Sequence, residues 1–165
     1  MGKRIGSSLS HYLVGGLAAL AMSGSGQASD PMSPIDIAQR YIAAYEAQDF
    51  DTMRALYASE ARFIDPNSFE MDHLTPDIDW HGPDEILAGI ASWGLVRGHY
   101  RIDRMYEASG RVVFDADIDV VYATPEGEQI YRFPIITILT IENGLVVEHR
   151  DYTGFNEMQR LETAP

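Results

Sequence analysis

The spacing of the hydrophobic residues changes once along this chain, and this change constrains the fold more than any other feature. Before Gly94, apolar residues recur at helical spacing, as in Ala38, Tyr41, Ile42 and Tyr45. After Gly94 they alternate with period two, which is typical of strands with one buried face. The expected order is helix, helix, strand, helix and then four strands, which predicts a single α+β domain.

Cap and turn residues mark the limits of the expected elements. Ser33 and Pro34 form a helix start, and Gly82 followed by Pro83 forms another. Turn signals at 124–127 and 142–144 separate the later strands. We expect a curved antiparallel sheet wrapped on three N-terminal helices, a cone-shaped α+β barrel with a pocket on its concave side. The expected strands are 61–65, 100–108, 112–123, 129–141 and 145–153, with a polar loop at 66–81 and a short terminal helix at 155–161.

Residues 1–28 have the pattern of a secretory signal peptide. Lys3 and Arg4 precede a short apolar run at 12–22, and small residues follow up to Ala28. The run is shorter than the roughly 20 apolar residues that a membrane span needs. We expect cleavage after Ala28, a mature domain of residues 29–165 in the periplasm or outside the cell, and no membrane association after cleavage.

The composition excludes several classes of function. The net charge is -13, and removal of Lys3 and Arg4 with the signal peptide makes it -15, so nucleic acid and anionic membranes are poor partners. Lys3 is the only lysine, which excludes Schiff-base chemistry from the mature chain. The absence of cysteine excludes thiol chemistry, zinc–thiolate sites and disulfides. No compact metal-binding motif is present, and we expect neither a metal nor a cofactor.

Tyr41 and Asp65 are the first candidates for a site. Tyr41 lies in the first expected helix, and Asp65 follows 24 residues later near the end of the first expected strand. A phenol that donates a hydrogen bond and a carboxylate that moves a proton make an acid–base site. The structural alternatives are a core tyrosine and an aspartate that begins a turn before Pro66.

Residues 39–44, 55–58 and 64–66 resemble the nuclear transport factor 2-like superfamily, in its SnoaL-like and ketosteroid-isomerase-like branches. The resemblance extends over nearly the whole mature chain. It implies a cofactor-free isomerase, cyclase or hydratase acting on a small apolar, steroid-like or polyketide-like molecule. In that family pattern Tyr41 is the electrophilic donor and Asp65 the base. Ile136 stands where the isomerases carry a second acid.

The later strands resemble a second branch, the limonene-epoxide-hydrolase-like proteins. Their Asp–Arg–Asp triad activates water, and Asp119 and Asp151 match its two aspartates. Asp117 stands at the position of the arginine. The resemblance makes Asp119 or Asp151 the auxiliary acid of the site.

For the expected strand at 112–123, the sequence leaves open which face of the strand is turned to the core. Asp117 and Asp119 alternate with Phe114, Ile118 and Val120, so the acids face water if the apolar residues form the core. In the opposite arrangement, Asp117 and Asp119 face the pocket. The apolar face would then be convex and available for a homodimer.

Further ligand contacts are expected from four side chains. His149 lies two positions before Asp151 on the same strand face, as a pocket pair or as a polar sheet end. Trp93, Phe69 and Ile136 are the apolar candidates, with Phe69 in a loop that could cover the pocket.

Two functional hypotheses remain from the sequence. The pair of Tyr41 and Asp65 favours an acid–base enzyme. Ile136 and Asp117, at positions where the related enzymes carry an acid and an arginine, favour a non-catalytic ligand-binding or scaffold domain of the same fold.

Overall fold

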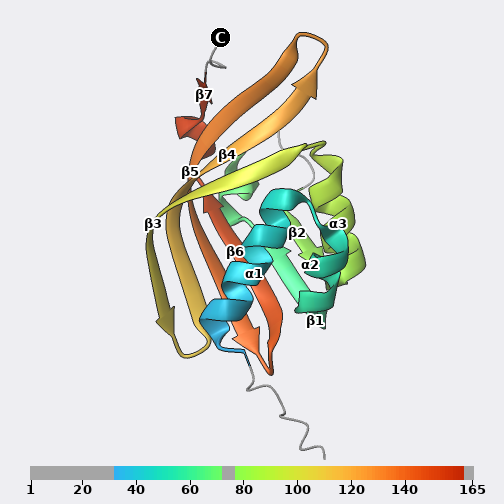
Figure 1. Ribbon diagram of the computed structural model, residues 1–165, viewed down its shortest axis with the longest axis vertical. Coiled ribbons are helices and arrows are strands. Elements are labelled where there is room, and N and C mark those ends of the chain that lie inside the picture. The colour runs from blue at the N-terminus through green and yellow to red at the C-terminus, as the bar shows by residue number, and fades with distance from the viewer. Residues whose placement is uncertain (1–31, 72–76, 162–165) are drawn as a thin grey trace, which may run out of the picture. The chain divides into compact units, whose positions relative to one another are not determined.

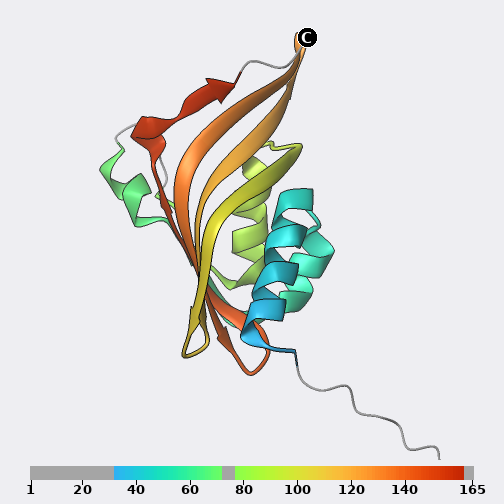
Figure 2. The same cartoon turned by 60° about the vertical axis from the view of Figure 1, so that its left-hand side comes forward.

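The computed structural model describes residues 32–71 and 77–161. Within these ranges three helices lie against one face of a strongly curved sheet (Figures 1 and 2). The expected signal peptide lies outside the described residues. No helix of the described part is long and apolar enough to cross a membrane.

The first helix, α1 (Pro34–Ala47), begins at a capping box. The Ser33 hydroxyl accepts a hydrogen bond from the backbone N–H of Asp36, and the Asp36 carboxylate accepts one from the backbone N–H of Ser33, both at 3.2 Å. The helix ends at Gln48, which adopts a left-handed conformation with φ 54°. The start expected at Ser33–Pro34 is therefore confirmed.

Two shorter helices follow. Asp49 caps α2 (Phe50–Leu56) by accepting a hydrogen bond from the backbone N–H of Thr52 at 3.1 Å. The third helix, α3 (Gly82–Ser92), has Pro83 in its first turn, where the missing N–H costs nothing. In α3 the buried residues are Ile86, Leu87 and Ile90, so its apolar stripe faces the sheet.

The sheet has the order β2-β1-β6-β5-β4-β3, with β7 paired to β5 beside β6. Strands β1 and β6 pair in parallel, and all other pairs are antiparallel. The sheet curves but does not close, because β2 and β3 form its two ends. The strands are β1 (Tyr57–Ile64), β2 (Asp79–His81), β3 (Arg97–Ala108), β4 (Arg111–Thr124), β5 (Gly127–Glu142), β6 (Leu145–Thr153) and β7 (Gln159–Leu161).

The sequence interpretation needs correction at the C-terminal end. The helix expected at 155–161 is only a single 3-10 turn, η2 (Phe155–Glu157), followed by β7. Strand β5 is 16 residues long, and β6 covers it only as far as Ile135. The exposed edge beyond that point pairs with β7 at 130–132, which satisfies backbone groups that a helix would leave open.

The expected loop at 66–81 contains two regular elements in its described part. A 3-10 helix, η1 (Pro66–Glu70), begins directly after Asp65, and β2 ends the segment. The first strand also starts earlier than expected, because α2 passes into β1 without a loop at Tyr57.

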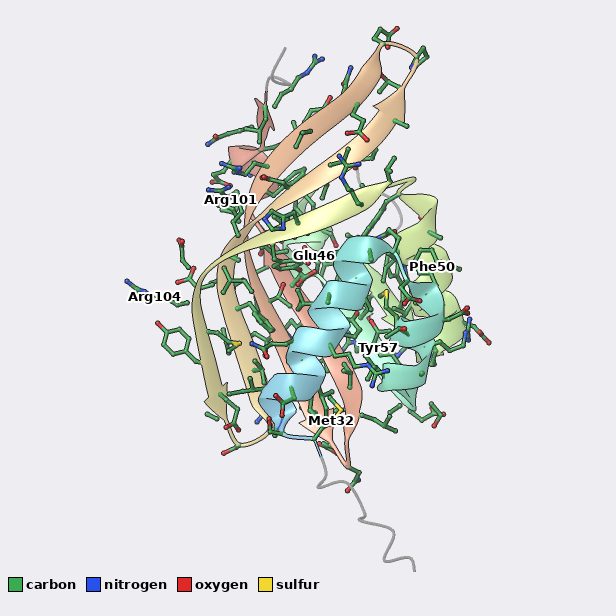
Figure 3. All side chains as sticks on the ribbon, viewed as in Figure 1. Met32, Glu46, Phe50, Tyr57, Arg101 and Arg104 are labelled. Atoms are coloured by element: carbon green, nitrogen blue, oxygen red, sulfur yellow. The ribbon has the colours of Figure 1, made fainter. Side chains whose placement is uncertain are left out.

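The hydrophobic core lies between the helices and the concave face of the sheet. Phe114, Ile118 and Val120 of β4 are buried there, so Asp117 and Asp119 lie on the convex face. The first of the two orientations left open by the sequence is the one observed. Arg104 of β3 points away from the helices on the same convex side (Figure 3). The apolar set on which the homodimer argument depended therefore belongs to the core.

Candidate functional site

A cavity of about 330 Å³ lies on the concave side of the sheet, within the described residues. Its described lining is mainly apolar, and the acids in it are Asp65 and Asp151. Among residues 32–71 and 77–161, no lysine, arginine or histidine lines it. The lining residues are Tyr45, Phe63, Asp65, Met71, Ile78, Trp93, Leu95, Ile118, Val120, Tyr122, Phe133, Ile135, Asp151, Thr153, Phe155 and Met158.

Asp65 reaches the cavity from the end of β1, with only 2% of its surface exposed. Its two carboxylate oxygens accept hydrogen bonds from backbone N–H groups, from Asn67 at 3.0 Å and from Thr153 at 3.2 Å. Burial raises the pKa of Asp65, and the charge of Asp151 raises it further, while these hydrogen bonds oppose the shift. Asp65 therefore both caps η1 and presents a carboxyl group of increased basicity to the cavity.

Asp151 reaches the cavity from the end of β6 and is 3% exposed. Its Oδ1 atom lies 2.9 Å from Nε2 of His149, and it also accepts a hydrogen bond from the Thr137 hydroxyl. The Thr137 hydroxyl in turn lies 2.9 Å from the hydroxyl of Tyr100. Asp151 is thus fixed by two neighbouring strands, β5 and β6.

The same network continues on the far side of His149. Its Nδ1 atom lies 2.7 Å from the hydroxyl of Tyr41, and the Tyr41 hydroxyl is hydrogen-bonded to that of Tyr57. Tyr41 and His149 have no exposed surface at all. Burial is the main reason why the pKa of Tyr41 and that of Tyr57 lie well above the usual range for a phenol.

The directions of these hydrogen bonds follow from Asp151. When Asp151 is ionised and His149 is the neutral Nε2–H tautomer, His149 donates from Nε2 to Asp151 and accepts at Nδ1. Tyr41 must then donate to His149, and Tyr57 must donate to Tyr41. The network thus has two arms, Tyr57–Tyr41–His149 and Tyr100–Thr137. In both arms each hydrogen bond is donated in the direction of Oδ1 of Asp151.

The second oxygen of Asp151 is available to a ligand. Oδ2 makes no hydrogen bond within residues 32–71 and 77–161, and it is not among their fully buried polar atoms. Because Asp151 lines the cavity, this oxygen is the one that can meet a bound molecule.

Tyr45 brings a phenol to the same cavity. It lies one helical turn after Tyr41 on α1, and its hydroxyl has no hydrogen-bond partner among the described residues. Burial, followed by the charge of Asp151, raises the pKa of Tyr45 well above the usual value, so the phenol keeps its proton at neutral pH. A neutral phenol can donate a hydrogen bond to a ligand oxygen.

The other expected site residues fall into three groups. Trp93 lines the cavity, and Tyr41 and His149 lie directly behind it in the network. Ile136 and Phe69 point away from it, with 43% and 46% of their surfaces exposed. Ile136 does not reach the cavity because Ile135 and Thr137 occupy the inward side of β5, and Phe69 lies on the 3-10 helix η1 rather than on the sheet.

Asp117 and Asp119 lie outside the cavity on the convex face. Asp119 forms a two-pronged ion pair with Arg132, with Nε–Oδ1 and Nη2–Oδ2 distances of 2.6 and 2.8 Å. Its charge is therefore compensated by a neighbour on β5. The structure thus brings together Asp65, Asp151, Trp93 and, through His149, Tyr41, but not Asp117 or Asp119.

Three important residues were not identified from the sequence. Tyr45 could have been found, because it follows Tyr41 at i+4 on the same helix face. Thr137 and Tyr100 gave no signal, since a threonine and a tyrosine in a strand are ordinary core residues. Among the described residues, no group of three or more His, Asp or Glu side chains could hold a metal ion.

Comparison with known proteins assigns this architecture. The SnoaL-like domain profile matches residues 38–149, which contain both arms of the network except Asp151. The chain belongs to the SnoaL-like domain family. No curated protein sequence matches the chain.

Solved structures agree with the fold of this SnoaL-like protein. A protein from Shewanella putrefaciens assigned as a SnoaL-like polyketide cyclase has a TM-score of 0.64 and 21% identity, over 76% of this chain and 93% of that one. The Δ5-3-ketosteroid isomerase from a Mycobacterium species has a TM-score of 0.65 and 15% identity, over 79% of this chain and 100% of that one. An epoxide hydrolase of the LEH-like type from M. tuberculosis has a TM-score of 0.61 and 15% identity, over 76% and 85%. At these identities the likeness extends to the fold alone.

Proposed function

We propose that this SnoaL-like protein is a cofactor-free acid–base catalyst for a small, mainly apolar molecule, of the isomerase, cyclase or hydratase type. The observation that supports it is the convergence of two buried carboxyl groups, Asp65 and Asp151, and one free phenol, Tyr45, on one apolar cavity. A concave site in which titratable groups converge, here with the pKa values of Asp65 and Tyr45 raised by burial, is typical of catalysis.

Asp65 is the base in this proposal. Its pKa is raised by burial and by Asp151, which makes the carboxylate a stronger acceptor for a proton on a carbon next to a carbonyl group. Tyr45 donates a hydrogen bond to the carbonyl oxygen while negative charge develops there. Asp65 then returns the proton to another position of the same molecule, so that no oxidant, metal or cofactor is consumed.

Asp151 acts beside this pair as an anchored carboxylate. His149 and Thr137 hold its Oδ1 atom, and its negative charge increases the proton affinity of Asp65. Tyr41, the donor expected from the sequence, is directed to His149 instead, and we assign its role to Tyr45.

Hydrogen–deuterium exchange into an enolisable ketone tests the proposal. Wild-type protein should accelerate exchange at the acidic carbon of 2-tetralone in D₂O, measured by NMR. Asp65→Asn should reduce the rate by about 10²–10⁴-fold, which is the usual contribution of a general base. Asp119→Asn is the matched control, because it removes the same charge on the convex face.

Binding of 2-naphthol, which imitates an enolate, gives a second readout. Tyr45→Phe should weaken it by about tenfold, as expected for one lost buried hydrogen bond. Tyr106→Phe, at an exposed position of β3, should leave it unchanged. If wild-type protein binds 2-naphthol but produces no exchange above the buffer rate, the chain is the non-catalytic binding domain.

We further propose that the protein is exported and that its mature form begins near Ser29. The support is the basic start, apolar run and small residues of positions 1–28. Mass spectrometry of the protein from its own host should find this terminus. A soluble form that retains Met1 or Gly2 would contradict export.

A homodimer remains a proposal with a changed basis. The large hydrophobic residues exposed on the convex side include Tyr106 of β3 and Ile136 of β5, rather than Phe114, Ile118 and Val120. Light scattering at micromolar concentration distinguishes a dimer from a monomer.

A further inference from the structure

We propose that the natural ligand of the cavity carries a positively charged nitrogen, as an ammonium group attached to an apolar body. This assignment rests on the proposed function, because it names the class of substrate for the same cavity. Three features of the described residues lead to it: uncompensated acids, an aromatic lining and the charge of the protein.

The two acids of the cavity have no cationic partner. Asp65 forms no ion pair with an arginine or lysine within residues 32–71 and 77–161. Asp151 has no arginine or lysine partner there either, and its one ion-pair contact is with the ring of His149, whose Nδ1 atom lies 2.7 Å from the Tyr41 hydroxyl. By contrast, Asp119 on the convex face has Arg132 as a close partner. Within the described residues, Asp119 thus has an arginine partner, whereas the two cavity acids have neither an arginine nor a lysine.

A neutral ligand would increase the electrostatic cost of keeping two carboxylates in the cavity. When an apolar molecule displaces water, two carboxylates lose their solvation and repel each other more strongly, so at least one must take up a proton. An ammonium group in the same place replaces the lost solvation for both acids. Its natural position lies between Asp65 and Oδ2 of Asp151, the oxygen that has no partner among the described residues.

The lining provides a second type of contact for a cation. Six of the lining residues are aromatic: Tyr45, Phe63, Trp93, Tyr122, Phe133 and Phe155. The rings of Phe63 and Trp93 meet at 67° with centroids 6.0 Å apart, and those of Phe133 and Phe155 meet at 75° with centroids 6.2 Å apart. Each of these two pairs of rings is steeply inclined, so the pair presents aromatic surface in two directions. The faces of aromatic rings attract cations.

The neighbouring surface hollow adds no cationic side chain among the described residues. A neighbouring hollow shares Tyr122, Phe133 and Met158 with the cavity, and its remaining residues are Ala123, Thr124, Gln129 and Tyr131. None of these side chains is cationic. The net charge of -13 attracts cations to the whole molecule.

A cationic substrate also suits the proposed chemistry. Removal of a proton from carbon creates negative charge next to Asp151, and only the neutral phenol of Tyr45 opposes it. A fixed positive charge on the substrate stabilises that developing charge.

Binding of three probes with the same apolar body tests the assignment. They are 1-naphthylmethylammonium, 1-naphthylmethanol and 1-naphthoate, titrated into the full chain by calorimetry at pH 7. The ammonium compound should bind at least tenfold more tightly than the alcohol, and the carboxylate should bind most weakly. Asp65→Asn and Asp151→Asn should each reduce the preference for the ammonium compound several-fold, whereas Asp119→Asn should not change it.

The outcomes separate this assignment from the proposed function. Equal binding of the ammonium compound and the alcohol would overturn the assignment, as would a preference that disappears in 0.5 M NaCl, because attraction to exposed charges is screened by salt. Loss of the preference in Asp119→Asn would also overturn it. Exchange of 2-tetralone without a preference for the ammonium compound would leave the proposed function intact. A preference without exchange would support the assignment for a binding protein.

Discussion

Replacement of His149 by leucine tests the buried network most directly. The leucine has a similar volume but cannot form hydrogen bonds, so the substitution removes the contacts of His149 with Tyr41 and Asp151 without leaving a large cavity. Both partners are almost fully buried, and water cannot replace the lost contacts. Tyr41 keeps its bond to Tyr57, and Asp151 keeps its bond to Thr137.

The cost can be estimated from these contacts. A hydrogen bond to a carboxylate contributes about 1.5–3 kcal/mol, and a bond between neutral groups contributes about 1 kcal/mol. His149→Leu should therefore lower the free energy of unfolding by about 2.5–4 kcal/mol. Urea denaturation followed by circular dichroism measures this change, provided that the denaturant slope stays constant.

A double-mutant cycle isolates the part that depends on charge. In an Asp151→Asn background the lost partner is a neutral amide, so His149→Leu should cost about 0.5–2 kcal/mol less than in the wild type. Removal of the exposed ion pair between Arg97 and Glu128 by Glu128→Gln should cost at most about 1 kcal/mol. A cost below about 1 kcal/mol for His149→Leu, or the same cost in both backgrounds, would refute the reasoning.

Two further predictions concern single positions. Gly89→Ala should destabilise the protein by about 1–3 kcal/mol in the same urea assay. A Cβ atom there would lie 2.5 Å from Cδ2 of Trp80, whose ring packs against Phe63. A stability equal to that of the wild type would show that the ring moves freely. For Asp65, the pKa in the folded protein lies above the usual 3.8. Below pH 3.8 the side chain is mainly protonated in both the folded and the unfolded protein, and burial of Asp65 then carries no ionisation cost. As the pH rises through the folded pKa, the native state must ionise a buried group, and wild-type protein should lose stability relative to Asp65→Asn between pH 4 and 7; a constant difference across this range would contradict the shift.

The sequence predicted the architecture because most helices and strands have their own local signal. The capping box at Ser33, the proline after Gly82 and the alternation of β4 are local features, and the structure contains them where they were expected. Strand β7 had no such signal. Its three residues are a strand only because β5 extends beyond β6 and leaves an edge to be paired.

The cavity was less accessible from the sequence for the same reason. The position of Asp65 at the end of β1 was evident, but the route from Tyr41 to Asp151 depends on His149, a residue of the distant β6. Position alone suggested that Tyr41 would face the ligand, and the structure gives that place to Tyr45 because Tyr41 is directed toward the sheet. Side-chain direction within a helix depends on what packs against it, which no local pattern records.

The parallel pairing of β1 with β6 also determines when the cavity can form. The contact between Asp65 and the backbone of Thr153 joins positions 88 residues apart, and it involves the last residue of the long strands. Contacts of such separation form slowly, because a large loop must close before they give any stability. A nascent chain that lacks β6 can build α1, α2 and the hairpin of β3 and β4, but Asp65 then has no opposite carboxylate and β1 has an open edge. Ligand binding should therefore appear only in the last step of folding, when backbone amides become protected from hydrogen exchange throughout the domain. It should not appear with the earlier increase in helix content.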